Sequence, residues 1–290
     1  MIPGQFDYHA PTTLDEAITL LGRIEGAKIL AGGHSLVPAM RFRLAAPQTL
    51  VDINRIEGLS HVEERADGLA IGALAREFQL EHSAAVARAY PLLLDTARVI
   101  ADPLVRNRAT VGGNLAHADP ANDHPATMLA YGAQIVARGK AGQRAIPIDD
   151  FFVGLFESSL RPGEILTEVR IPRPPPGSGG AYLKIERKVG DYAVAAVAVQ
   201  LQVSGGTIQR ARIGLTNVNP VPSRAKNAEA ALVGKEPTEA VLEAAGKAAA
   251  AECDPSADLR GPVDYKRDMV RVLTKRAVLR AVRRAQGAEA

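Results

Sequence analysis

Two pairs of adjacent glycines constrain this chain more than any other feature. One pair stands in residues 31–35, Ala-Gly-Gly-His-Ser, and the other in residues 110–114, Thr-Val-Gly-Gly-Asn. Glycine adopts positive φ at little cost and has no Cβ, so two in succession let consecutive backbone N–H groups point into one concavity. A hydrogen-bonding side chain follows each pair. We therefore expect two loops that close on one anionic ligand, and a pyrophosphate is the natural candidate.

The pattern around the first pair supports this expectation. Residues 28–31 have the pattern of a buried strand, residues 35–42 that of a short helix, and residues 49–53 that of a second strand. The glycines thus lie between a strand end and a helix start, where unpaired N–H groups and the helix dipole favour phosphate. Ser35 can cap the helix or bond a phosphate oxygen. The alternative is that each pair forms an ordinary turn, because glycine is frequent in loops.

Several standard signatures are missing from the chain. It contains no G-x-G-x-x-G, no G-x-x-x-x-G-K-[ST] and no G-x-S-x-G, and residues 177–180, which come nearest to the first, follow a proline run. Its one cysteine, Cys253, excludes a disulfide framework, an iron–sulfur cluster or a cysteine-rich zinc site built from this chain alone. His34 and His117 are expected to be hydrogen-bonding groups in loops. We expect neither catalytic nor metal-binding residues.

Five stretches carry a resemblance to a known family: residues 11–17, 30–36, 110–123, 162–166 and 184–192. They lie in order along the chain, and together they resemble the FAD-binding subunit of the molybdenum hydroxylases, the carbon monoxide dehydrogenase and xanthine dehydrogenase family. The remainder is similar to the family's C-terminal domain in length and character. The resemblance implies an α+β fold. It has a two-part FAD-binding domain of the PCMH or vanillyl-alcohol-oxidase type, not a Rossmann domain, followed by a small α+β domain of antiparallel strands plus helices.

The expected organisation has four parts: an N-terminal FAD-binding subdomain at 1–55, a second at 56–172, a linker at 173–180 and a C-terminal α+β domain at 181–290. A capping box, Thr13-x-x-Glu16, predicts a helix over 14–21 inside a β-α-β-α-β unit. Further predicted strands are 69–73, 133–137 and 165–171, with a hairpin of 194–203 and 207–216. Further predicted helices are 75–82, 84–90, 92–101, 223–234, 238–252 and 264–286.

The resemblance also implies how FAD is held. Its phosphates would lie between the two glycine segments, and residues 29–36 would line the ADP side. Carried over residue by residue, the cofactor-binding set is Ile29, Leu30, Ala31, Gly32, Gly33, His34, Ser35, Leu36, Ile100, Thr110, Val111, Gly112, Gly113, Asn114, Asp123, Leu166, Lys184 and Tyr192. Asp123 would bond the ribityl or adenosine portion, Lys184 would approach the flavin ring or the phosphates, and Tyr192 would cover one face of the isoalloxazine.

Other interpretations of these residues stay open from the sequence. Asp123 precedes a helical pattern and could be its N-cap. Ile100 and Leu166 would be core residues in almost any fold. Lys184 lies in a charged run that is typical of a solvated strand face. Tyr192 could be a buried core aromatic.

Composition limits the class of partner. The aromatic fraction is 4% with no tryptophan, so base-stacking surfaces for nucleic acid are not expected. Residues 264–286 carry eight Lys and Arg against two Asp, although the formal net charge of the whole chain is +3. That basic helix is either a solvated face or a docking surface for an acidic partner or a membrane surface. We find no secretory signal and no apolar run of about 20 residues, and the cysteine usage fits a cytoplasmic protein.

The resemblance implies an oxidoreductase subunit that transfers electrons. A large partner with the molybdenum cofactor would oxidise the substrate, a small partner would carry [2Fe–2S] clusters, and FAD in this chain would deliver the electrons to a terminal acceptor. The assembly would be a dimer of heterotrimers. Two alternatives remain: a stand-alone FAD-dependent oxidase or reductase that acts on a small molecule, and a scaffold whose glycine segments have lost their ligand.

Overall fold

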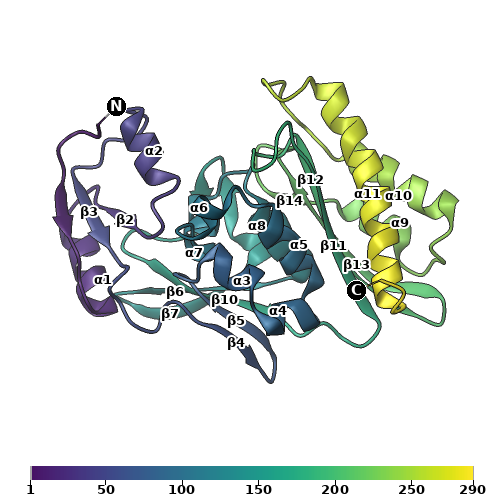
Figure 1. The fold of residues 1–290 in the computed structure, drawn as a ribbon, viewed down its shortest axis with the longest axis horizontal. Helices are drawn as coiled ribbons and strands as arrows, with labels where there is room; N and C mark the ends of the chain where they lie inside the picture. The colour runs from purple at the N-terminus through teal and green to yellow at the C-terminus, as the bar shows by residue number, and fades with distance from the viewer. Residues whose placement is uncertain (1, 290) are drawn as a thin grey trace.

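A computed structural model describes residues 2–289, so the outermost residues of the expected first and last domains, Met1 and Ala290, lie outside it. Figure 1 shows three blocks along the long axis, in chain order from the N-terminus. The first is a β-α-β-α-β unit, as predicted: β1 (Asp7–His9), α1 (Leu14–Arg23), β2 (Lys28–Leu30), α2 (Leu36–Arg41) and β3 (Thr49–Asp52). Its three strands pair in parallel in the order β1-β3-β2.

The predicted N-cap of α1 is present, but the Glu16 side chain bonds the residue before the N-cap and so does not complete the capping box. The Thr13 hydroxyl accepts the Glu16 N–H at 3.3 Å, while the Glu16 carboxylate accepts the Thr12 N–H at 3.1 Å. Behind this helix, Ala17 and Val51 are fully buried in a small apolar cluster that Ile165 of the next block completes. The first block therefore packs on the second through side chains from both.

The central block is a five-stranded antiparallel sheet in the order β4-β5-β10-β6-β7. Its strands are β4 (Val62–Arg65), β5 (Gly68–Gly72), β6 (Gln134–Gly139), β7 (Gly142–Pro147) and β10 (Ile165–Pro172). Its helices are α3 (Glu77–Glu81), α4 (Ala84–Ala89), α5 (Pro91–Val99), α6 (Pro103–Arg106), α7 (Val111–His117) and α8 (Asp123–Tyr131). Figure 1 shows these helices between this sheet and the C-terminal sheet. A 3₁₀ turn (Ile148–Asp150) leads into a separate hairpin, β8 (Phe152–Gly154) and β9 (Glu157–Ser158).

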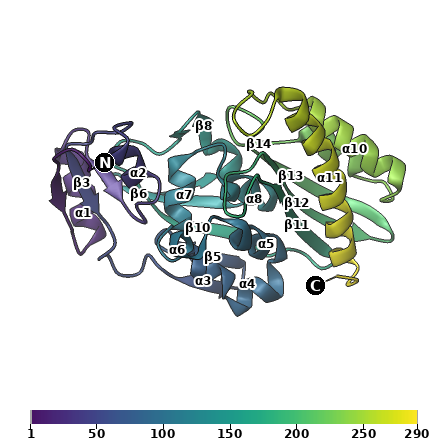
Figure 2. The ribbon, with the colours of Figure 1, turned by 45° about the horizontal axis from the view of Figure 1, so that its top comes forward.

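The third block is an antiparallel sheet of β11 (Ser178–Ile185), β12 (Ala195–Ser204), β13 (Thr207–Thr216) and β14 (Ser223–Arg224), followed by α9 (Lys226–Leu232), α10 (Glu239–Ala251) and α11 (Val263–Ala285). Successive side chains of a strand point to opposite faces. Ala196 and Ala198 of β12 join the core of the central block, whereas Val197 and Val199 join the cluster under α11. Figure 2 shows α11 lying across this sheet.

The expected linker is shorter than its composition suggests. Residues 178–180 are the first part of β11 and pair with residues 200–202 of β12. A Cβ at Gly179 would collide with the carbonyl oxygen of Ala281 in α11, and one at Gly180 would lie 2.8 Å from the Cβ of Leu92. These glycines therefore permit close packing between layers, and the prediction that they belong to a flexible linker is wrong.

Much of the positive charge of the basic helix α11 is paired with carboxylates of this same chain. Five of its cations form ion pairs with carboxylates elsewhere in the protein, namely Lys266, Arg271, Lys275, Arg280 and Arg284. Two of them, Arg280 and Arg284, reach Asp95 of α5, so the helix is fastened to the central block. None of the helices between residues 2 and 289 combines the length and apolar character that crossing a bilayer requires.

Candidate functional site

The two glycine segments lie directly against each other. Gly32 packs on the backbone of residues 108–110, where a Cβ would come closer than 3.0 Å to the carbonyl oxygen of Arg108 and 3.1 Å from the amide nitrogen of Thr110. Gly33 has φ of 77°, in the left-handed region that favours glycine. Only a chain without a Cβ at residue 32 can bring the segments this close.

The first segment offers open backbone amides. Within residues 2–289, the N–H groups of residues 32–35 have no hydrogen-bond acceptor, although the carbonyls of Gly33 and Ser35 accept bonds from the first turn of α2. The Ser35 side chain does not cap the helix, and His34 Nδ1 lies 2.9 Å from the carbonyl oxygen of Gly32. Four consecutive N–H groups at a helix start are therefore available to an anion.

The second segment behaves differently. Its glycines lie in the first turn of α7, where the Gly112 N–H donates to the carbonyl of Ala73 at 3.0 Å and the Gly113 N–H donates to the Thr110 hydroxyl at 3.2 Å. The Asn114 N–H donates to the Thr110 carbonyl at 2.9 Å. The amides of both glycines and of Asn114 thus already have acceptors within the chain, and the expectation that both segments present amides to one anion stays a prediction that the open amides of the first segment support.

The second segment instead supplies shape and one polar side chain. A Cβ at Gly112 would lie 2.6 Å from the Cβ of Ala73, so the glycine lets α7 pack closely on the end of β5. The side-chain oxygen of Asn114 is buried and has no hydrogen-bond partner in the structure. A buried polar atom without a partner costs free energy, so this amide is a ready contact for a polar ligand.

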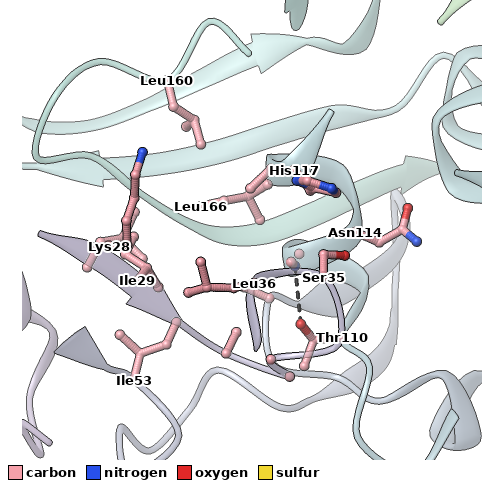
Figure 3. A pocket seen from close by; sticks show the side chains of 18 of the residues that line it. Lys28, Ile29, Ser35, Leu36, Ile53, Thr110, Asn114, His117, Leu160 and Leu166 are labelled. Carbon is pink, nitrogen blue, oxygen red and sulfur yellow. Dashed lines mark hydrogen bonds between the residues drawn. The ribbon is translucent and has the colours of Figure 1, made fainter. Parts of the chain in front are cut away.

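A cleft of about 520 Å³ opens between the first and second blocks at these segments. Its size is in the range of small-molecule and cofactor sites. Of the residues predicted to bind the cofactor, those that line it are Ile29, Ala31, Gly32, Gly33, His34, Ser35, Leu36, Thr110, Gly112, Gly113, Asn114 and Leu166. Figure 3 shows Lys28 and Ile29 at one end of the view, Leu36 and Leu166 in its middle, and a more polar end where Ser35, Thr110, Asn114 and His117 lie.

Six predicted residues do not line this cleft: Leu30, Ile100, Val111, Asp123, Lys184 and Tyr192. Ile100 and Val111 are buried. Asp123 and its neighbours start close to the cleft, because the Asn122 side chain donates to the carbonyl of Asn114 at 2.9 Å. The structure thus brings most of the set together around the glycines, and the other six residues lie outside the lining of the cleft.

Asp123 and Lys184 are bonded to each other. The Lys184 ammonium donates to Asp123 at 3.1 Å and to the carbonyl of Val99 at 3.2 Å, and the Tyr182 hydroxyl donates to Asp123 at 2.5 Å. Burial raises the pKa of Asp123 even though Lys184 opposes that rise. Asn122, not Asp123, is the N-cap of α8, and the Lys184 side chain is 3% exposed, so the capping and solvated-face interpretations are both wrong.

Tyr192 lies at the surface, 43% exposed, so it is not a core aromatic. The guanidinium of Arg260 stands 5.4 Å from the centre of its ring. Asp191 fixes this arrangement, because it accepts bonds from Arg260 and from the Tyr192 N–H, each at 2.8 Å. The contact with Arg260 lowers the pKa of Asp191 to about 2.

The sequence reasoning missed a bracket that holds the two glycine segments together. The Asn54 side chain donates to the carbonyl of Ala31 at 2.8 Å and accepts a bond from the Arg76 guanidinium at 2.6 Å. Arg76 also donates to the carbonyl of Arg108. Burial, with the nearby Arg108, lowers the pKa of Arg76. These partners are far apart in the chain, and no local sequence pattern predicts their contact.

Comparisons with known proteins match both parts of the chain. The family model described as the FAD binding domain in molybdopterin dehydrogenase matches residues 4–174. The model of the CO dehydrogenase flavoprotein C-terminal domain matches residues 180–281. Together they cover nearly the whole chain, and they confirm the expected fold class of an FAD-binding domain followed by a small α+β domain.

Individual relatives match along their full length. The carbon monoxide dehydrogenase medium chain of Hydrogenophaga pseudoflava is 46% identical over 279 residues, which cover 96% of this chain and 97% of the relative. The 6-hydroxypseudooxynicotine dehydrogenase complex subunit alpha of Paenarthrobacter nicotinovorans is 37% identical over 288 residues, with 99% and 97% covered. A solved carbon monoxide dehydrogenase from Hydrogenophaga pseudoflava, which lacks the Mo-pyranopterin moiety of the molybdenum cofactor, matches with a TM-score of 0.95 and 48% identity over 97% of this chain and 98% of that chain.

Proposed function

The chain belongs to the FAD-binding medium subunits of the molybdenum hydroxylases, and from this membership we propose that it is the subunit through which electrons leave such an enzyme. The family shows that the chain is part of an oxidoreductase and carries an FAD-binding domain. Bound FAD supplies the redox chemistry, accepting electrons from a one-electron donor and passing them on in pairs. The protein supplies the position, the electrostatic surroundings and the control of access.

The residues present fit this cofactor, and one observation carries the proposal: residues 32–35, whose four amides are open, line the cleft. They would hold the diphosphate, because backbone N–H groups at a helix start neutralise anionic oxygens. Asn114, whose side-chain oxygen lacks a partner, would bond a neighbouring polar group of the cofactor. Gly112 and Gly113 would act by keeping the second segment close.

We extend the cofactor site beyond Asn114 to the buried pair of Asp123 and Lys184. The hydrogen bond from Asn122 to Asn114 connects this pair to the cleft. Ile100 follows α5, whose last residue, Val99, accepts the Lys184 bond through its carbonyl. Tyr192 lies close enough to Asp119 and Asp123 for their charges to contribute to the rise in its pKa, after the larger effect of burial. These side chains would orient the flavin end of the cofactor.

The partners follow from what this chain lacks. One cysteine cannot hold an iron–sulfur cluster, so any cluster that feeds electrons to the FAD would have to lie in another polypeptide. We assign that role to a small subunit with [2Fe–2S] clusters and substrate oxidation to a large subunit with the molybdenum cofactor, assembled as a dimer of heterotrimers. The names of the relatives, a medium chain and a complex subunit, support such an assembly.

The test has two stages. The full chain is first purified alone, and the flavin that it releases on denaturation is identified by chromatography; we expect FAD at one per chain. The chain is then produced together with the products of neighbouring genes and purified through a tag on this chain alone. Co-purification of two further subunits with molybdenum and iron supports the proposal. A flavoprotein that oxidises a substrate without partners, or a chain without flavin, would refute it.

A further inference from the structure

A glutamate and a histidine form a hydrogen-bonded pair in the core of the central block, and neither of them lines the cleft. Glu77 is the first residue of α3 and His124 is the second residue of α8, and both side chains are completely buried. The carboxylate oxygen Oε2 of Glu77 lies 2.7 Å from Nε2 of His124. Ionisable side chains are rarely buried to this extent, because their transfer out of water is costly.

The pair also leaves two polar atoms without partners. Within residues 2–289, Oε1 of Glu77 and Nδ1 of His124 are buried and have no hydrogen-bond partner, like the side-chain oxygen of Asn114. Each such atom costs free energy, and two apolar side chains of similar volume would fill the same space without that cost. The stability of the core therefore does not account for the pair, and the elements that it joins do.

The contacts around the pair close a ring that contains the second glycine segment. The Glu77 N–H donates to the carbonyl of Ala109 at 3.2 Å, immediately before that segment. At the end of the segment, the carbonyl of Asn114 accepts the Asn122 side chain at 2.9 Å. The chain then runs on to His124, whose ring bonds back to Glu77. The bond between Glu77 and His124 is the one link of this ring that joins two side chains.

Two consecutive residues at the start of α3 thus connect three parts of the candidate site. Arg76 belongs to the bracket that holds the two glycine segments together, and Glu77 directly follows it. His124 in turn directly follows Asp123, the buried carboxylate at the start of α8. Breaking the pair would therefore free Asn114 and Asp123 to move relative to each other and to the first glycine segment.

We propose that Glu77 and His124 are positioning residues of the cofactor site, which hold the Asn114 side chain and the Asp123 carboxylate at the separation that FAD requires. The inference rests on the proposed function, because that function places Asn114 and Asp123 along one bound cofactor. A hydrogen bond keeps its two groups within a narrow range of distance and angle, whereas apolar contact is non-directional. The pair therefore gives the ring a fixed geometry that two apolar side chains would not give.

The experiment separates stability from binding by a double substitution. The flavin-free full chain is titrated with FAD by flavin fluorescence, and its thermal unfolding is followed without ligand. Glu77→Leu breaks the pair, Glu77→Leu combined with His124→Leu makes both positions apolar, and Glu77→Gln keeps a hydrogen-bonding group for His124. Thr127→Val is the matched control, because Thr127 is fully buried on α8 and bonds Thr96 at 2.7 Å, and neither threonine lines the cleft.

We expect Glu77→Leu to lower the unfolding midpoint and to weaken FAD binding on the order of tenfold, less than the roughly hundredfold cost of a 1 Å displacement at a site, because the pair acts through other residues. The double variant should regain most of the midpoint, since it leaves neither position with an unpartnered polar atom, and should keep the weakened FAD binding. Glu77→Gln should recover most of the affinity that Glu77→Leu loses. Thr127→Val should lose stability alone.

A double variant that regains FAD affinity together with its midpoint would overturn the inference, because the pair would then serve stability only. The same conclusion would follow from an equal loss of affinity in Thr127→Val, or from a Glu77→Leu variant that binds FAD like the parent. If Glu77→Leu does not fold, the double variant and Glu77→Gln decide the question. If the parent chain binds no FAD, the proposed function itself fails, and that result is seen before any variant is made.

Discussion

Replacing Gly32 by alanine tests the contact between the two glycine segments, on which the cofactor site depends. The new Cβ would lie closer than 3.0 Å to the carbonyl oxygen of Arg108 and 3.0 Å from the Cα of Ala109. Ordinary contact begins at 3.4 Å, so the segments must separate by more than about 0.4 Å. Both neighbours are backbone and cannot rotate away.

The separation should act on binding more than on folding. Overpacking of this kind costs about 1–3 kcal/mol of stability. It also moves the open amides of residues 32–35 away from Asn114, and misplacement on the order of 1 Å at a site costs about a hundredfold. We therefore expect the dissociation constant for FAD to rise by on the order of tenfold to a hundredfold, equivalent to about 1.4–2.8 kcal/mol. A β-branched residue should have a larger effect.

The assay is a fluorescence titration of the flavin-free full chain with FAD, together with thermal unfolding. The matched control is Gly234→Ala in the C-terminal block, where φ is 76° and an added Cβ would meet nothing within 4 Å. That variant should lose about 1–2 kcal/mol of stability from the left-handed backbone and bind FAD normally. If Gly32→Ala binds FAD as tightly as the parent, the close contact between the segments is not what builds the site.

Other substitutions test the surrounding contacts. Lys184→Met should destabilise the fold by about 3–5 kcal/mol, because the Asp123 carboxylate stays buried without its lysine partner. Adding Asp123→Asn should recover part of that loss in thermal unfolding. An unfolding midpoint of Lys184→Met equal to that of the parent would contradict the pairing. The pKa of Asp191 is about 2, below its ordinary 3.8, so its stabilising contribution is complete above about pH 4 and is lost as the pH falls toward 2. The free energies of unfolding in urea of the parent and of Asp191→Asn should therefore differ at neutral pH and converge near pH 2. Arg76→Lys should weaken FAD binding on the order of tenfold, because an ammonium cannot bridge Asn54 and the Arg108 carbonyl as the planar guanidinium does; a titration that gives the parent value would show that the bracket is dispensable.

The sequence predicted the fold wherever the signal was local. The N-cap Thr13 marks the start of α1, and the glycines at 205 and 206 mark the turn between β12 and β13. The prediction was wrong where the same residue composition fits two different structural roles. Gly179 and Gly180 follow prolines and suggest a flexible linker, yet they are small because α11 and Leu92 pack against them. Only the packing of distant layers distinguishes these uses.

In the candidate site, too, some features could be predicted from the sequence and others could not. The glycine pairs could be found from the sequence, but their separate roles could not, because hydrogen bonding decides whether an amide is open. The Thr110 hydroxyl accepts the Gly113 amide as the local N-cap of α7, whereas the bond from the Gly112 amide to the Ala73 carbonyl depends on α7 packing against the end of β5. The bracket of Asn54 and Arg76 carries no local pattern at all. It becomes visible only when segments that are far apart in the chain meet beside the cleft.

The C-terminal block reaches the proposed extension of this site through buried charge. Lys184 and Tyr182 extend from β11 to Asp123 at the start of α8, so the carboxylate of one domain has its hydrogen-bonding partners in the other. A buried carboxylate without them would be costly, and this gives the two domains a fixed relative position. In the same way, Arg284 of α11 forms an ion pair with Asp95 of α5. The basic character of α11 is therefore explained in large part by contacts inside the chain. A partner subunit would bind an FAD-binding domain whose position relative to the C-terminal sheet is already fixed.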